Sequence, residues 1–280
     1  MSDRPLPDFL VIGAVKAATT WLHAQLQANP ALYLPDPEPH YFSSDYDRGI
    51  DFYRDFFTDA PDGAMLGEKS ADYLAHPHAA SRIAALLPDV PMVVQLRNPV
   101  ERAYSDYCML YRRGTVQGPP EAYFDRATTT QPRFLDDGLY AQHLQRWYDL
   151  FDPAQIHVLL FEDVKKAPRL TMQAVCEHIG APHHFVDALS DRRVNDGSAQ
   201  FLPLALRNAL APFKDSVKPL RNNPVFNGVR NLLVREVRYP PFLPDTRARL
   251  VDFYAKDVER LGKMLNRDLG HWLNTERMAA

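Results

Sequence analysis

The chain has 280 residues, of which 46% are hydrophobic and 24% are charged, and its formal net charge is −3 at pH 7. This composition is close to that of an average globular protein and supplies enough apolar material for one large α/β domain or two small ones. The slight excess of acids argues against a general nucleic-acid-binding protein, because neutralising phosphates requires a basic surface.

The sequence contains no segment typical of secretion or membrane insertion. Its first seven residues have no apolar core, and no apolar run approaches the roughly 18 residues of a membrane span. We therefore expect a cytoplasmic protein without a membrane span, and the oligomeric state stays open. Cys108 and Cys176 lie in apolar helical patterns and are predicted to be buried free thiols, and the histidines show no spacing typical of a metal site.

The first predicted element is an apolar strand at 9–14, followed by a turn of small residues and a helix that begins at Thr19 and Thr20. Lys16 stands in the turn. Helix N-terminal N–H groups beside a cation form an anion site, so we expect this turn to hold a phosphate or sulfate. A Walker A loop fits less well, because alanine follows Lys16 where that motif has a hydroxyl residue. The alternative is an ordinary connection whose lysine faces solvent.

Two further apolar runs, at 91–96 and 155–161, are predicted strands. Helical spacing of apolar residues predicts helices at 79–87, 99–111, 139–151, 169–179 and, with a cap at Asp245-Thr246, up to Leu265. This alternation predicts an α/β fold with a central, mainly parallel sheet flanked by helices. We expect a single domain over 1–280, in which the irregular segment 181–245 forms an insertion or lid at the acceptor site.

Arg97 follows the second of these strands, and Ser105 lies about two turns into the next helix. Ligands in open α/β sheets bind at the carboxyl ends of strands, and an arginine with a hydroxyl suits a terminal phosphate. The alternative is that Arg97 pairs with Glu101 and that Ser105 lies on a solvated face.

The two segments together resemble the PAPS-dependent sulfotransferases, where PAPS is 3′-phosphoadenosine 5′-phosphosulfate. That family has a Lys-x-Gly-Thr-Thr-like loop around the 5′-phosphosulfate, and an arginine and a serine eight positions apart, here Arg97 and Ser105, that bind the 3′-phosphate. The resemblance implies a P-loop-like three-layer fold, PAPS as the sulfuryl donor, PAP (3′-phosphoadenosine 5′-phosphate) as the product, and no metal. It assigns the cofactor's phosphosulfate to Lys16, Ala17, Ala18, Thr19, Thr20 and Trp21. Ala18 stands where the family has glycine, which is tolerable if φ stays negative there.

Two more segments resemble the heparan-sulfate-sulfotransferase-like bacterial branch of this family. Residues 37–42 resemble its Glu-x-x-Phe-Phe segment, which gives Glu38 the role of general base, and 67–73 resemble its Glu-Lys-Ser/Thr segment, which places Lys69 in the active-site cleft. Taken alone, Glu38 is more simply interpreted as a surface loop residue, and Lys69 beside Glu68 as part of a solvated ion pair. We expect His40 to be a packing or acceptor-rim residue rather than the base.

The family's Lys-Gly element before the last helices is absent, and we expect Arg192 or Arg193 to supply its cation. The implied reaction is in-line transfer of the sulfuryl group to a hydroxyl or amine, with Lys16 stabilising the departing phosphate.

The acceptor is expected to be a carbohydrate or a small molecule. Residues 201–240 hold seven Lys or Arg against two acids, which suits an anionic sugar or a solvated lid, and aromatic residues there suit an aromatic or lipid-like acceptor. A kinase-like phosphotransferase and a non-catalytic nucleotide-binding relative are the alternatives.

Overall fold

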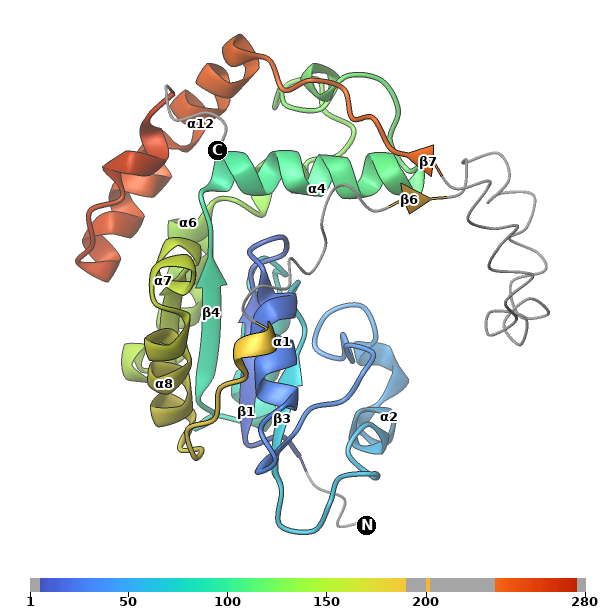
Figure 1. Cartoon of the computed structure of the whole chain (residues 1–280), viewed down its shortest axis with the longest axis vertical. Coiled ribbons are helices and arrows are strands. Elements are labelled where there is room, and N and C mark those ends of the chain that lie inside the picture. Colours follow the sequence, from blue (N-terminus) through green and yellow to red (C-terminus); the bar gives the residue numbers. More distant parts are fainter. Residues whose placement is uncertain (1–5, 190–199, 202–234, 276–280) are drawn as a thin grey trace, which may run out of the picture.

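The computed structural model describes residues 6–189, 200–201 and 235–275. Five strands form one parallel sheet in the order β2-β3-β1-β4-β5 (Figure 1). The strands are β1 Phe9–Gly13, β2 Leu32–Tyr33, β3 Met65–Lys69, β4 Met92–Leu96 and β5 Ile156–Leu160. A separate antiparallel pair consists of β6 Gln200–Phe201 and β7 Arg235–Glu236. The predicted α/β fold with a mainly parallel sheet is confirmed.

Helices connect the strands and cover both faces of the sheet (Figure 1). The α-helices of the described residues are α1 Thr19–Gln27, α2 Ile50–Asp55, α3 Ala79–Leu86, α4 Pro99–Arg113, α5 Arg133–Asp136, α6 Tyr140–Tyr148, α7 Phe161–Lys166, α8 Pro168–Ile179 and α12 Pro244–Leu265. Short 3₁₀ turns occur at Tyr46–Arg48, Pro120–Ala122, Pro153–Gln155, Asp187–Leu189 and Gly270–Leu273.

The three layers follow from the alternation of side chains along the strands. In β1, Leu10 and Ile12 join the larger hydrophobic core, which α3, α4, α6 and α12 cover. Phe9 and Val11 point the other way and pack with α1 and α8 in a second core. Because both faces of β1 are apolar, the strand is a continuous hydrophobic run, as expected at the centre of a parallel sheet.

Several predicted details were wrong. The strands β2 and β3 were not predicted, and the residue Phe161, taken as the end of a strand, begins α7. The helix α12 starts at Pro244 without a side-chain cap, because proline at the first position already has a helical φ, and Asp245 favours the first turn by its charge. Cys176 is a buried free thiol as predicted, but Cys108 is only half-buried.

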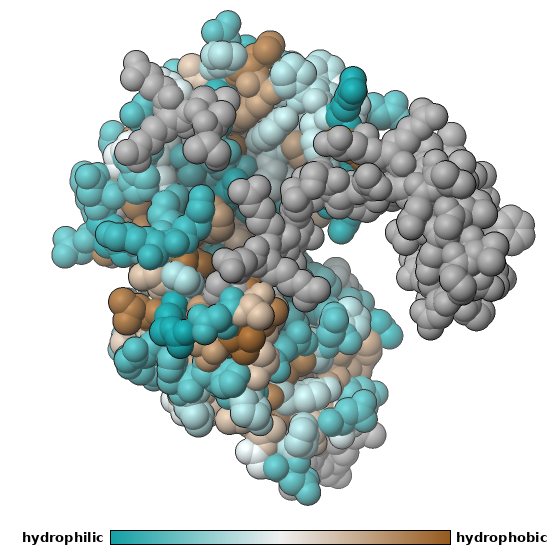
Figure 2. Space-filling model, in the orientation of Figure 1, coloured by the Kyte–Doolittle hydropathy of each residue, from teal (hydrophilic) through white to brown (hydrophobic). Residues whose placement is uncertain are grey.

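The surface seen in Figure 2 is largely hydrophilic, with hydrophobic side chains interspersed. The large apolar side chains exposed among the described residues are Tyr46, Leu150, Leu170 and Leu243. In the same part of the chain, no helix has the length and apolar character needed to cross a membrane. Most of the predicted lid, including Arg192 and Arg193, lies outside the described residues.

Candidate active site

Three neighbouring strands, β3, β1 and β4, end at the same edge of the sheet. Just beyond their ends lie the segment after Lys69, the loop that carries Lys16, and Arg97. Gly13 permits the close approach of the first two segments, because a Cβ there would stand 2.8 Å from the Ala71 carbonyl oxygen. The topology therefore brings together three of the predicted site segments at the position where open α/β sheets bind ligands.

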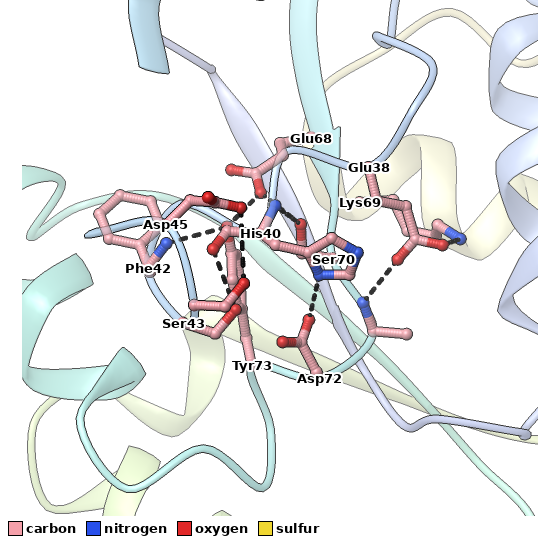
Figure 3. A network of polar contacts seen from close by, with 12 residues as sticks. Glu38, His40, Phe42, Ser43, Asp45, Glu68, Lys69, Ser70, Asp72 and Tyr73 are labelled. Atoms are coloured by element: carbon pink, nitrogen blue, oxygen red, sulfur yellow. Dashed lines mark hydrogen bonds and ion pairs between the residues drawn. The ribbon is translucent and has the colours of Figure 1, made fainter. Parts of the chain in front are cut away.

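Glu38 and Lys69 form an ion pair across this edge (Figure 3). The Lys69 ammonium donates to Glu38 Oε1, and the backbone N–H of Ala71 donates to Oε2 at 3.1 Å. The Lys69 side chain is 4% exposed, whereas that of Glu38 is 30% exposed, so a molecule outside the protein can reach the carboxylate but hardly the ammonium. Each carboxylate oxygen keeps a lone pair for a further hydrogen bond.

Glu68 does not pair with Lys69, which corrects the alternative of a solvated ion pair. Successive side chains of a strand point to opposite faces, and Glu68 is fully buried among hydroxyl groups while Lys69 turns to Glu38. Burial raises the pKa of Glu68 to about 7, and hydrogen bonds from Tyr53, Tyr73 and Ser70 oppose this rise.

The loop between β1 and α1 has an unusual backbone. Lys16 has φ of 68° and Ala18 has φ of 69°, so both are left-handed. The expectation that φ stays negative at Ala18 was wrong. Because alanine has a β-carbon, this conformation costs about 1 kcal/mol at Ala18, whereas glycine would adopt it freely. Ala18 caps α1 with its backbone alone, and no side chain caps this helix, so the first-turn N–H groups face the loop.

Positive charge is concentrated around Lys16. Its ammonium lies 3.8 Å from the Met109 sulfur on α4. Burial lowers the pKa of Lys16; Asp106 opposes this, and Arg112, Arg113 and Arg97 lower the pKa further. The three arginines repel the Lys16 ammonium, so an anion bound beside it would be stabilised by several positive charges.

Arg97 lies at the start of this charged region. Its Nη2 is 3.9 Å from Glu101 Oε2, and its guanidinium carbon is 5.2 Å from the centre of the Phe161 ring. The alternative pairing with Glu101 is therefore present as a loose ion pair, since 3.9 Å is too long for a hydrogen bond. Arg247 of α12 binds the other carboxylate oxygen of Glu101, Oε1. Ser105 lies in α4 and is half-buried.

Two histidines near Glu38 have environments that sequence reasoning did not predict. His40 Nδ1 lies 2.7 Å from Asp72 Oδ1, and this hydrogen bond raises the pKa of His40 (Figure 3). His23 of α1 is buried, and burial lowers its pKa to about 4, with the charge of Lys69 adding to the effect. The charges of Lys69 and Glu38 therefore both affect the pKa of His23, which lies on α1. Among the described residues, no group of acids, histidines and cysteines could hold a metal ion.

The family model described as "Sulfotransferase domain" matches residues 6–197. The chain is 30% identical, over 302 residues, to the bifunctional heparan sulfate N-deacetylase/N-sulfotransferase 3 of Mus musculus. That alignment covers 98% of this chain and 32% of the mouse protein. A second alignment, with heparan sulfate glucosamine 3-O-sulfotransferase 3B1 of Homo sapiens, has 30% identity over 190 residues and covers 66% of this chain and 49% of the human protein.

Among solved structures, the chain is similar to that of a sulfotransferase from Alicyclobacillus acidocaldarius, with a TM-score of 0.69 and 25% sequence identity. The superposition covers 96% of this chain and 100% of that one. The similarity therefore extends over the whole sheet and its helices. Relative to the two curated relatives, the chain spans only 32% of the length of the first and 49% of the second.

Proposed function

The chain belongs to the sulfotransferase family, and from this premise we propose that it transfers the sulfuryl group of PAPS to a hydroxyl or amine of a carbohydrate or small-molecule acceptor. The observation that carries the proposal is the Glu38–Lys69 pair, whose carboxylate is half-exposed at the edge of the sheet beside the positively charged Lys16 loop. A base next to an anion site is the arrangement that sulfuryl transfer to a protic acceptor requires.

The residues around Lys16 suit PAPS as the donor. They combine several cations with an N-terminal helix end that no side chain caps, and both features attract phosphate and sulfate groups. Lys16 and the first turn of α1 would hold the 5′-phosphosulfate, and Arg97 with Ser105 the 3′-phosphate. Bound in this way, PAPS supplies the sulfuryl group and a phosphate that departs with negative charge.

In this proposal Glu38 accepts the proton of the acceptor hydroxyl or amine as its oxygen or nitrogen attacks the sulfur. The bond between the sulfur and the phosphate oxygen then breaks. Lys69 and the Ala71 N–H hold the carboxylate in one orientation, which favours a productive geometry before the reaction begins. Lys16 offsets the negative charge that develops on the departing phosphate oxygen. The half-buried ammonium of Lys16 interacts more strongly with that charge than an ammonium in water would.

The acceptor class rests on the relatives, two of which are named for heparan sulfate. A carbohydrate hydroxyl or amine is therefore the first candidate, and a small molecule the second. His40 and Asp72 lie beside Glu38 with side chains that are 40% and 37% exposed, so they are placed to hydrogen-bond an acceptor that approaches this carboxylate.

The test is calorimetric titration of the protein with PAP in EDTA, with a parallel titration of ATP in a Mg²⁺ buffer without EDTA as the comparison. Arg97→Ala is expected to weaken PAP binding about 10- to 100-fold, because a charge-assisted hydrogen bond contributes roughly 1.5–3 kcal/mol. Arg260→Ala is the matched control, since it removes the same charge from an exposed side chain of α12 that binds Gln145. Binding of ATP with Mg²⁺ in preference to PAP would contradict the proposal and favour a phosphotransferase.

Turnover is measured as PAP formation from PAPS, with heparan sulfate and p-nitrophenol as representative acceptors. Rates above that of PAPS alone identify the acceptor class. Tight PAP binding without turnover on either acceptor, or on a wider panel, would favour a non-catalytic nucleotide-binding relative.

A further inference from the structure

The carboxyl group of Glu68 is fully buried beneath the candidate active site. Its Oε1 accepts hydrogen bonds from Ser70 Oγ at 2.8 Å and from the Tyr73 hydroxyl at 2.5 Å (Figure 3). Its Oε2 accepts a hydrogen bond from the Tyr53 hydroxyl of α2. Burying a carboxyl group is unfavourable even with such partners, so its presence here points to a role beyond packing.

Two of these hydroxyls also bind the segment that carries Glu38. Ser70 Oγ accepts a hydrogen bond from the backbone N–H of His40, with an N···O distance of 2.9 Å. The Tyr73 hydroxyl oxygen accepts one from the backbone N–H of Phe42, with an N···O distance of 3.1 Å. A hydroxyl that donates to a carboxyl group turns its lone pairs away from it, toward other donors. Glu68 therefore orients both hydroxyls as acceptors for the 38–42 segment.

The segment is stiff enough to transmit this anchoring to Glu38. Glu38 lies between Pro37 and Pro39, whose rings fix φ, and a residue that precedes proline is confined to extended conformations. Fixing the N–H of His40 thus fixes the backbone of Glu38 two residues earlier. On the other side of the segment, Arg82 of α3 donates to the carbonyl oxygen of Phe42 at 2.9 Å.

We propose that Glu68 is a positioning residue that, through Ser70 and Tyr73, holds the 38–42 segment where Glu38 meets Lys69. The inference rests on the proposed function, in which Glu38 is the base. Two adjacent residues of β3 then act on Glu38 by different routes: Lys69 binds its carboxylate directly, and Glu68 fixes the backbone that carries it.

Tyr73→Phe and Tyr53→Phe form a matched pair for testing this inference. Each variant removes one hydroxyl that donates to Glu68 and keeps the buried ring. Among the described contacts, however, only the Tyr73 hydroxyl also binds the 38–42 segment. Ser70→Ala removes the second link, to His40.

Hydrogen exchange of the backbone amides measures the anchoring without any need for activity. Ser70→Ala should speed exchange of the His40 amide at least tenfold, Tyr73→Phe should do so for the Phe42 amide, and Tyr53→Phe should change neither. Glu68→Leu should speed the exchange of both the His40 and the Phe42 amide. Protection of both amides in a folded Glu68→Leu protein, or equal effects of Tyr53→Phe and Tyr73→Phe, would overturn the inference.

Kinetics supply the second readout. With the best acceptor of the panel, Tyr73→Phe and Ser70→Ala are expected to lower kcat roughly 10- to 100-fold, because small displacements of a catalytic group have effects of this size. Their affinity for PAP should stay within twofold of wild type, and Tyr53→Phe should keep its kcat within twofold. If wild-type protein forms no PAP from PAPS, the proposed function fails, whereas the exchange result still decides the role of Glu68.

Discussion

Replacing Glu68 with glutamine is expected to change how the stability of the protein depends on pH. The carboxyl group is fully buried, and this burial raises its pKa from an ordinary 4.5 to about 7. Between these two values the folded protein binds a proton at Glu68 that the unfolded chain has released. Glutamine resembles the protonated carboxyl: its oxygen can accept from Ser70 and Tyr73, and its NH₂ can donate to the Tyr53 oxygen.

The size of the effect follows from the two pKa values. One proton bound by the folded state alone changes the free energy of unfolding by about 1.4 kcal/mol per pH unit. The interval from 4.5 to about 7 therefore corresponds to about 3 kcal/mol. Because the folded pKa is raised, this stability is fully present below pH 4.5 and is lost as the pH rises to about 7. Glutamine does not titrate, so Glu68→Gln does not undergo this loss.

The assay is urea unfolding of wild-type protein and Glu68→Gln at one-unit steps from pH 4.5 to 8.5. The free energy of unfolding of the variant minus that of wild type should rise by about 3 kcal/mol over this range and level off above pH 7. Glu259→Gln makes the same chemical change on an exposed position of α12 and serves as the control. Parallel curves for wild type and Glu68→Gln, within 1 kcal/mol, would refute the reasoning.

Three further predictions concern the site. Glu38→Gln should lower kcat about 10²- to 10⁴-fold at unchanged affinity for PAP, and a turnover equal to wild type would remove Glu38 as the base. Ala18→Gly should raise the free energy of unfolding by about 1 kcal/mol, seen as a Tm about 2 °C higher, since it relieves a left-handed alanine; a lower Tm would contradict this. Asp72→Asn should lower the pKa of His40, measured by NMR titration of the ring, because the Asp72 hydrogen bond raises it. Since the pKa of His40 is raised and that of Asp72 is lowered, the pair stabilises the fold between pH 3.8 and 6.5 and less so as the pH rises above 6.5, and this pH dependence should flatten in the variant.

The central part of the fold could be predicted from the sequence because its strands are mostly apolar, with Gln95 in β4 and His157 in β5 as the polar exceptions. β1, β4 and β5 are hydrophobic runs followed by helical patterns, and the parallel sheet follows from that alternation. β3 could not be found in this way. Its sequence, Met-Leu-Gly-Glu-Lys, ends in two charged residues, which a hydrophobic pattern excludes from a buried strand.

The conformation of the Lys16 loop was also beyond the reach of sequence patterns. Lysine and alanine disfavour positive φ, and local preference therefore predicts the opposite conformation at both positions. Contacts formed by distant parts of the chain compensate for the strain: the Gln95 side chain of β4 donates to the Ala17 carbonyl oxygen at 2.6 Å, between the two left-handed residues. A loop strained in this way next to a cluster of cations is consistent with selection for ligand binding rather than for stability.

The motif around Glu68 and Lys69 shows most clearly what a pattern of residues can and cannot convey. The resemblance identified these residues as important, but two opposite charges side by side in the sequence are most simply interpreted as an ion pair. In a strand, neighbouring side chains point to opposite faces, so Glu68 and Lys69 cannot form an ion pair with one another. Lys69 faces the edge of the sheet and Glu38, whereas Glu68 faces the hydroxyls of Tyr53, Ser70 and Tyr73. Lys69 and Glu68 both act on Glu38, the first through its carboxylate and the second through its backbone. Which of the two residues faces Glu38 follows from the pairing of β3 with β1 and β2 in the sheet.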